Sequence, residues 1–112
     1  MAALDPKTLA ELKSLMGDNY KTVFQAFIKS AQQCLDDLAS AIENNETHKT
    51  ERASHTLKGS SANIGAVELS SLCAEMVAMA RNSVPQGYTE VLQEILAEYD
   101  RVKAEIAVLL AE

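Results

Sequence analysis

The chain has 112 residues, of which 47% are hydrophobic and 4% aromatic, with only four glycines and two prolines. This length fits one domain with a single core, and so few glycines and prolines exclude a fold built on many tight turns. The formal net charge of −6 argues against a nucleic-acid or anionic-membrane binder, because both reward basic surfaces.

Residues 6–16 are predicted to form a short first helix. Asp5 can cap its start, Pro6 suits its first turn and Gly17 can close it. No apolar run in the chain approaches the roughly 20 residues that a membrane span needs. The start of the chain also lacks the apolar core of a signal peptide, because it contains the charged residues Asp5, Lys7, Glu11 and Lys13. We therefore expect a cytoplasmic location and no membrane partner.

The second helix is expected over residues 18–43. Its apolar residues recur at steps of three and four, which is typical of one buried helix face; they are Tyr20, Val23, Phe24, Phe27, Ile28, Ala31, Leu35, Leu38 and Ile42. Asn44 and Asn45 follow and favour a turn.

The third helix, expected over residues 46–64, is unusually polar. On a helix, one side carries small and modestly apolar residues, which we expect to face inward: Thr50, Ala53, Leu57, Ser61 and Ile64. The opposite side should meet solvent and carries Glu51, Arg52, His55, Lys58, Gly59 and Ala62.

Two further amphipathic helices are expected over residues 67–82 and 88–111, separated by a break at residues 83–87. Four long amphipathic helices with short connections pack best as an antiparallel bundle. The fold class predicted for residues 1–112 is therefore all-α, a single up-down-up-down four-helix bundle with a short extra N-terminal helix. The two cysteines, Cys34 and Cys73, fit no metal-binding spacing and are expected to be buried free thiols.

The chemistry of the chain is concentrated on the outer side of the third helix. His55 and Lys58 are three residues apart, so their side chains are neighbours on the helix surface. An exposed imidazole offers a nucleophilic nitrogen near neutral pH, and a lysine one turn away can offset the charge of a phosphoryl group. Gly59 costs about 1 kcal/mol relative to alanine inside a helix; it either clears space beside His55 or lets another helix approach closely.

Residues 55–65, which read His-Thr-Leu-Lys-Gly-Ser-Ser-Ala-Asn-Ile-Gly, resemble the motif of histidine-containing phosphotransfer (HPt) domains. That motif is a histidine, any residue, a hydrophobe, lysine, glycine, two small residues, two variable ones, a hydrophobe and glycine. Every position is met, and the expected architecture also resembles the family over about the whole chain.

The resemblance implies a phosphohistidine carrier of two-component phosphorelays. His55 would be phosphorylated on Nε2 and would exchange the phosphoryl group with an aspartate of a response-regulator receiver domain. Lys58 would support the phosphate, Gly59 would clear the approach, and Ala62, Arg52 and Glu51 would belong to the docking rim. The partners implied are receiver domains and a hybrid sensor histidine kinase, and the chain would act as a monomer.

The resemblance also implies that the chain binds no cofactor or metal, because the receiver supplies Mg²⁺. The chain has no Gly-rich phosphate loop or hydrolase motif, so we expect no enzyme with its own ATP-binding or hydrolytic site. The alternative is a docking module that binds receiver or kinase domains without accepting phosphate. The pattern fits a free-standing carrier and a domain of a hybrid kinase equally well.

One feature departs from the family pattern, and a metal site is weighed as another explanation of the histidines. Some HPt domains hold the imidazole through a polar side chain that aligns near Val77, and a valine cannot accept a hydrogen bond. His48 lies two turns before His55, about 10 Å away along a helix, which is too far for both rings to grip one metal ion. Glu51 and His55 form an i,i+4 pair that could take part in a bundle metal site, but no second such pair is present.

Overall fold

The computed structural model describes residues 2–112, which contain five α-helices and no strand. The α-helices are α1 (Pro6–Met16), α2 (Tyr20–Glu43), α3 (Thr47–Asn63), α4 (Val67–Arg81) and α5 (Tyr88–Ala111). Single turns of 3-10 helix precede α2, at Gly17–Asn19, and α5, at Pro85–Gly87. The second helix therefore begins two residues later than expected, because the chain first completes a tight turn after Gly17 (φ 56°).

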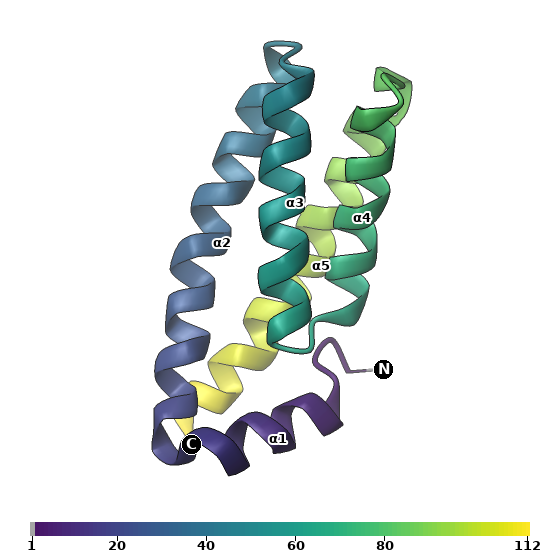
Figure 1. The fold of residues 1–112 in the computed structure, drawn as a ribbon. Helices are drawn as coiled ribbons and strands as arrows, with labels where there is room; N and C mark the ends of the chain where they lie inside the picture. The colour runs from purple at the N-terminus through teal and green to yellow at the C-terminus, as the bar shows by residue number, and fades with distance from the viewer. Residues whose placement is uncertain (1) are drawn as a thin grey trace.

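Helices α2 to α5 run up and down side by side as a four-helix bundle, and α1 lies across one end of it (Figure 1). The predicted all-α architecture is thus confirmed. Asp5 caps α1 by accepting a hydrogen bond from the Thr8 N–H, and Pro6 occupies the first turn. No helix within residues 2–112 is long and apolar enough to cross a membrane.

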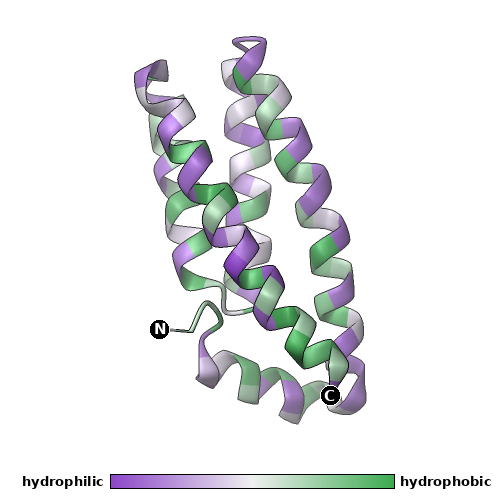
Figure 2. Cartoon of the chain, turned by 180° about the vertical axis from the view of Figure 1, so that it is seen from behind, coloured by the Kyte–Doolittle hydropathy of each residue, from purple (hydrophilic) through white to green (hydrophobic). Residues whose placement is uncertain are grey.

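The core consists mainly of the apolar stripes of α2, α4 and α5. Hydrophobic and hydrophilic residues alternate along each helix, as a bundle with one inward face per helix requires (Figure 2). Phe24, Leu38, Met76 and Ile95 have no exposed surface. These side chains hold the helices together by burying apolar area, at about 25 cal/mol per Å².

The inward face of α3 is built differently, with three hydroxyl residues around Leu57. Thr50, Ser54 and Ser61 are fully buried. The Thr50 hydroxyl donates to the Glu46 carbonyl at 3.0 Å and the Ser54 hydroxyl donates to the Thr50 carbonyl at 2.8 Å. Two of these polar groups are thus satisfied within the helix itself. Short side chains on this face let α3 pack closely on α4 while its opposite face stays in water.

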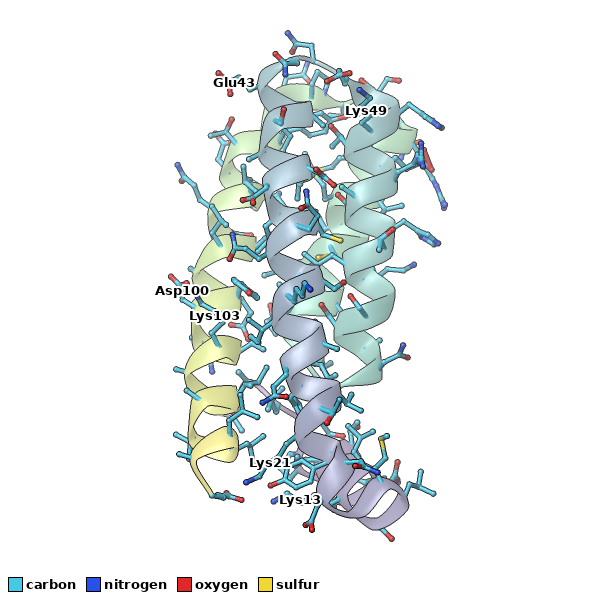
Figure 3. All side chains as sticks on the ribbon, turned by 90° about the vertical axis from the view of Figure 1, so that its left-hand side faces the viewer. Lys13, Lys21, Glu43, Lys49, Asp100 and Lys103 are labelled. Atoms are coloured by element: carbon cyan, nitrogen blue, oxygen red, sulfur yellow. The ribbon has the colours of Figure 1, made fainter. Side chains whose placement is uncertain are left out.

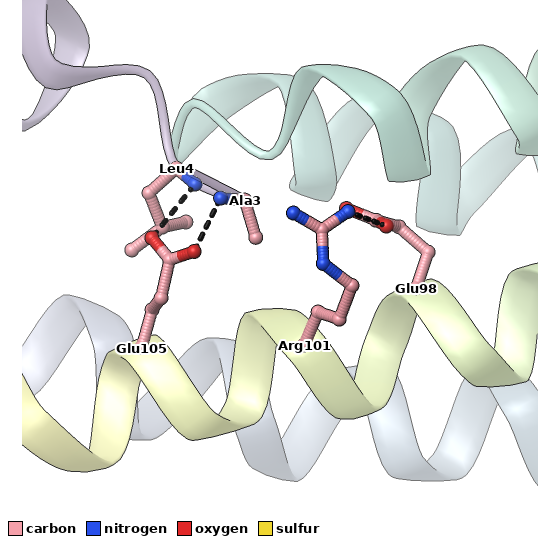
Figure 4. Close-up of polar contacts among 5 residues, drawn as sticks. All are labelled: Ala3, Leu4, Glu98, Arg101 and Glu105. Atoms are coloured by element: carbon pink, nitrogen blue, oxygen red, sulfur yellow. Dashed lines mark hydrogen bonds and ion pairs between the residues drawn. The ribbon is translucent and has the colours of Figure 1, made fainter. Parts of the chain in front are cut away.

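The segment before α1 is anchored to the bundle by backbone hydrogen bonds. The N–H groups of Ala3 and Leu4 both donate to the Glu105 carboxylate of α5 (Figure 4). The Asp5 N–H donates to the Gly65 carbonyl at 2.8 Å. Nearby on α5, Arg101 Nη1 lies 2.6 Å from Oε1 of the buried Glu98 (Figure 4). The N-terminal segment is therefore packed onto the connection between α3 and α4.

Lys13 holds the opposite end of α1 to α2 and to the last residue of the chain, and Lys21 of α2 binds that same residue. Lys13 and Lys21 lie close together where α1 meets α2 (Figure 3). Lys13 Nζ is 3.5 Å from a carboxylate oxygen of Glu112 and 5.2 Å from the centre of the Tyr20 ring. Lys21 Nζ donates to the Glu112 carbonyl at 2.8 Å. Both ends of α1 are thus fixed, and α1 closes the end of the bundle.

The two cysteines are free thiols, as expected, but only Cys73 is buried, whereas Cys34 is half-buried. Within residues 2–112, no Cα atom of α2 lies within 8 Å of a Cα atom of α4. Since a disulfide needs Cα atoms less than about 7 Å apart, Cys34 and Cys73 cannot pair without movement of the backbone.

Candidate functional site

His55 stands on the exposed side of α3, near the middle of the bundle. Its close neighbours in sequence on the inner face of the helix, Ser54 and Leu57, have no exposed surface. The helix therefore presents the imidazole to water because its neighbours fill the core. Arg52, Gly59 and Ala62 are exposed on the same outer side, as predicted, and Glu51 and Lys58 are half-buried at its edge.

Lys58 lies at the border of the exposed side that faces α4. A helical side chain leans over the turn that precedes its own Cα, so the Lys58 stem points back toward the turn of His55. The Ser70 hydroxyl of α4 donates to the Lys58 backbone carbonyl at 3.0 Å. This bond fixes the backbone of Lys58 against α4, while the ammonium group at the end of a flexible stem can follow an incoming phosphoryl group.

Gly59 faces open space. A Cβ atom added at this residue would meet no heavy atom within 4 Å. The explanation that another helix approaches closely at Gly59 is therefore wrong. A side chain at this position would lean over the turn of His55, so its absence leaves the imidazole uncovered on that side.

An ion pair links Glu51 to the adjoining helix. Arg81, in the last turn of α4, places its Nε 2.7 Å from Oε1 of Glu51. The hydrogen bond from Arg81 holds the pKa of the Glu51 carboxyl below its ordinary value, and partial burial opposes this shift. The positive potential of Arg81, His48 and His55 adds to the lowering. Glu51 is therefore a fixed, ionised group one turn before His55, whereas the sequence placed it only in the docking rim.

The other side of His55 opens toward α2. A depression of about 480 Å³ lies between α2 and α3, and its lining includes Arg52, Ala53 and Thr56 of α3 and Cys34 and Asp37 of α2. Arg52 and Gly59 border His55 on this side, whereas Glu51 and Lys58 border it on the α4 side. His55 thus has a fixed carboxylate, Glu51, and the flexible Lys58 toward α4, and an open approach toward α2.

His48 is exposed near the start of α3. Within residues 2–112 no group of three or more His, Cys, Asp or Glu side chains is placed to hold a metal ion. Val77, the position at which some HPt domains carry a polar side chain, is buried with 4% of its surface exposed. It packs as a core residue and offers the imidazole no acceptor.

Three contributors were not found from the sequence: Ser54, Ser70 and Arg81. Ser54 extends the buried face, and the spacing of Thr50, Leu57 and Ser61 could have indicated it. Ser70 and Arg81 contact α3 across a helix interface. No local pattern predicts such contacts, because they depend on the relative rotation of α3 and α4.

A bundle that presents a histidine to solvent with a lysine and an uncovered glycine beside it defines a class of protein, the phosphohistidine carriers. The family model described as Hpt domain matches residues 22–105 of this chain, and the chain belongs to that family. It is a phosphohistidine carrier of phosphorelays, in which Hpt domains interact with response regulators and kinases. No curated protein sequence is significantly similar to this chain.

Two solved structures share the fold. Histidine-containing phosphotransfer protein B (HptB) from Pseudomonas aeruginosa PAO1 superposes with a TM-score of 0.87 at 27% identity, covering 97% of this chain and 91% of that chain. The histidine-containing phosphotransfer protein ZmHP2 from maize gives a TM-score of 0.87 at 20% identity, covering 97% of this chain and 88% of that chain. The second similarity shows the fold alone.

Proposed function

We propose that His55 is the phosphorylated residue, and that its Nε2 exchanges the phosphoryl group with an aspartate of a receiver domain. The observation that carries this proposal is the exposed imidazole with open space at Gly59. The chain has only one other histidine, His48, which lacks a lysine three residues later and a glycine four residues later.

The transfer moves one phosphoryl group between two nucleophiles. The Nε2 lone pair of neutral His55 attacks the phosphorus of the aspartyl phosphate, a P–N bond forms, and the P–O bond to the aspartate breaks with its electron pair. The carboxylate leaves and the ring keeps the proton on Nδ1. Lys58 is proposed to offset the charge on the phosphoryl oxygens during this step. Reversal of the same steps returns the group to a receiver.

The receiver is proposed to supply Mg²⁺ and an acidic pocket, and this chain is proposed to contribute no metal, cofactor, ATP-binding or hydrolytic site. Helix α3 carries three Lys or Arg residues and one acid in a chain of net charge −6. This basic helix would attract an acidic receiver surface and raise the association rate. We propose docking over Gly59, Ala62 and Arg52, around His55 and toward the side that opens to α2, whereas Glu51 lies on the side toward α4.

We further propose that the chain acts in the cytoplasm as a monomer, receiving the phosphoryl group through a hybrid sensor histidine kinase. The exposed residues around His55 would form the contact with each partner in turn. Such a relay contact is expected to be small and transient, since the carrier must release one partner to meet the next.

A transfer experiment tests the assignment. The full chain is incubated with a phosphorylated receiver and Mg²⁺, and the label on the chain is tested for lability in acid and stability in alkali. We expect label on the wild type and on His48→Gln, and none on His55→Gln. Label that persists in His55→Gln would refute the assignment. A receiver complex that forms without any label on the wild type would identify a docking module instead.

A further inference from the structure

The His55 ring has no hydrogen-bond partner among the described residues 2–112, and the buried Val77 of α4 has no polar group to offer it. The identity of the nitrogen that carries the proton decides whether Nε2 can attack. In proteins this is set by the hydrogen bond that the other ring nitrogen makes. A group that accepts the Nδ1 proton would therefore prepare the ring for the transfer.

We propose that Glu51 is the positioning residue for His55, accepting a hydrogen bond from Nδ1–H while Arg81 holds the carboxylate in place. This inference rests on the proposed role of His55. It assigns Glu51 to the orientation of the ring instead of to partner docking.

The position of Glu51 on α3 fits this role. It precedes His55 by four residues, and side chains at i and i+4 on a helix are neighbours. Because a helical side chain leans toward the helix N-terminus, the His55 ring is carried over the turn that contains Glu51. In the proposed arrangement, rotation of the His55 side chain brings Nδ1 to the carboxylate, and the helix backbone stays as it is.

The ion pair with Arg81 prepares the carboxylate. Arg81 Nε contacts Oε1 at 2.7 Å, and no described residue bonds to Oε2, which leaves that oxygen as an acceptor. The Glu51 side chain is 28% exposed against 59% for Arg81, so the carboxylate is the less mobile partner. The hydrogen bond from Arg81 is the main cause of the lowered pKa of Glu51, and the positive potential of His55 makes the last contribution.

The arrangement separates two roles around the ring. Glu51 and Arg81 would act on Nδ1 from the α4 side, and Lys58 would act on the phosphoryl group at Nε2. A negative carboxylate directly at Nε2 would repel the incoming phosphoryl group, and the positive charge of Arg81 offsets part of the negative potential of Glu51. The approach toward α2 stays open to the receiver.

The ring tautomer is the direct test, and it needs no partner protein. The full chain, labelled with ¹⁵N-histidine, is studied by long-range ¹H–¹⁵N correlation NMR at about pH 8.5, where an ordinary imidazole is neutral. We expect more Nδ1–H form for His55 than for His48. Glu51→Ala should change the His55 tautomer ratio by roughly twofold, the size of a side-chain pair at i,i+4 on a helix. Glu51→Gln should retain part of the effect, since its amide oxygen still accepts.

Two controls make the result specific. Glu75→Ala removes another exposed carboxylate, on α4, and should leave the ratio unchanged. Arg81→Ala should move the ratio in the same direction as Glu51→Ala, but less, because the carboxylate is then unrestrained.

In the transfer assay Glu51→Ala should slow phosphorylation about twofold with unchanged receiver affinity.

A His55 tautomer ratio that is the same in the wild type and Glu51→Ala would overturn this inference. Loss of receiver affinity in Glu51→Ala with an unchanged ratio would also overturn it, because that outcome assigns Glu51 to docking. Absence of label on His55 in the wild type would instead refute the proposed function. The two failures are therefore distinguishable.

Discussion

The Ser70 hydroxyl and the Lys58 carbonyl lie 3.0 Å apart and join α4 to the turn of α3 between His55 and Gly59. The bond holds the backbone from which the Lys58 side chain extends. The bond involves the backbone carbonyl of Lys58 and not its ammonium group, which can therefore act in the transfer. Substitutions at these two residues can therefore separate structural support from charge.

Replacing Lys58 by alanine is predicted to slow phosphoryl transfer about tenfold, equivalent to about 1.4 kcal/mol of transition-state stabilisation. The ammonium would no longer offset charge on the phosphoryl oxygens. The midpoint of thermal unfolding should change little, because Lys58 is half-buried on the helix surface. Rapid-quench measurements of transfer from a phosphorylated receiver, together with calorimetry, check both parts.

Lys58→Arg and Ser70→Ala are the matched controls for this prediction. Arginine keeps the charge in a different shape and should recover part of the rate. Ser70→Ala removes the support of the Lys58 carbonyl and should cost about 1 kcal/mol of stability, with a transfer rate near that of the wild type. Equal rates for wild type and Lys58→Ala would remove Lys58 from the proposed mechanism.

Substitutions of Gly59 are predicted to raise stability and, when large, to impair docking. A Cβ atom at this position meets nothing within 4 Å, and glycine inside a helix is less stable than alanine by about 1 kcal/mol. Gly59→Ala should therefore be more stable than the wild type. Gly59→Gln should also gain stability but bind the receiver roughly tenfold more weakly, because its side chain covers His55.

Urea unfolding and titration calorimetry with the receiver measure the two effects of the Gly59 variants separately. Ala62→Gln is a useful comparison, since Ala62 is exposed on the same side but one turn further from His55. Undiminished receiver affinity in Gly59→Gln would mean that the gap is not needed for access.

Gly65→Ala is predicted to destabilise the chain by about 2–4 kcal/mol. Gly65 has φ +80°, and an added Cβ would lie 2.9 Å from Thr8 Cβ and 3.3 Å from the Asp5 nitrogen. Gly17→Ala provides the matched comparison, because Gly17 has φ +56° but open space around its Cβ position. Because its ψ of −138° lies outside the left-handed helical region, alanine should cost about 1–3 kcal/mol of backbone strain there.

Denaturant unfolding of Gly65→Ala and Gly17→Ala shows whether backbone strain or contact with neighbouring atoms requires glycine at residue 65. Similar losses in both variants would show that the positive φ alone requires glycine. A larger loss in Gly65→Ala would show that the N-terminal segment, packed on the end of the motif, adds its own constraint.

Burial raises the pKa of the Cys73 thiol to about 12, with a smaller contribution from Cys34. The pKa of Cys34 is also raised by burial, and Asp37 adds to this. Because alkylation requires the thiolate, iodoacetamide at pH 8 should modify half-buried Cys34 slowly and Cys73 only after unfolding. Mass spectrometry of the native and denatured chain measures this order. Faster labelling of native Cys73 than of Cys34 would contradict the packing of α4.

The raised pKa of the Cys73 thiol predicts a loss of stability at alkaline pH. The unfolded thiol has the ordinary pKa of 9.0, so above this pH the unfolded state loses the Cys73 proton while the folded state keeps it. The unfolded state then binds fewer protons, and stability falls as the pH rises from 9 toward 12. Cys73→Ala should be less stable at neutral pH but show a shallower decline over this range in urea unfolding.

Much of the fold was predictable because its determinants are local. The three-and-four spacing of apolar residues in α2 and α5 predicts helices with one buried face. Asp5 and Pro6 mark the start of α1, and Gly17 marks its end. The errors lie at helix ends and edges, such as the 3-10 turn before Tyr20 and the half-buried Cys34, where neighbouring elements compete with local preference.

The sequence by itself determined that residues 55–65 form one solvent-facing and one inward-facing strip, since both follow from helical periodicity. The tertiary structure alone decided which groups from other helices meet that strip. The contacts of Ser70 with Lys58 and of Arg81 with Glu51 join residues 12 and 30 positions apart. They depend on how α3 and α4 are rotated against each other, a result of packing many side chains at once that no local pattern encodes.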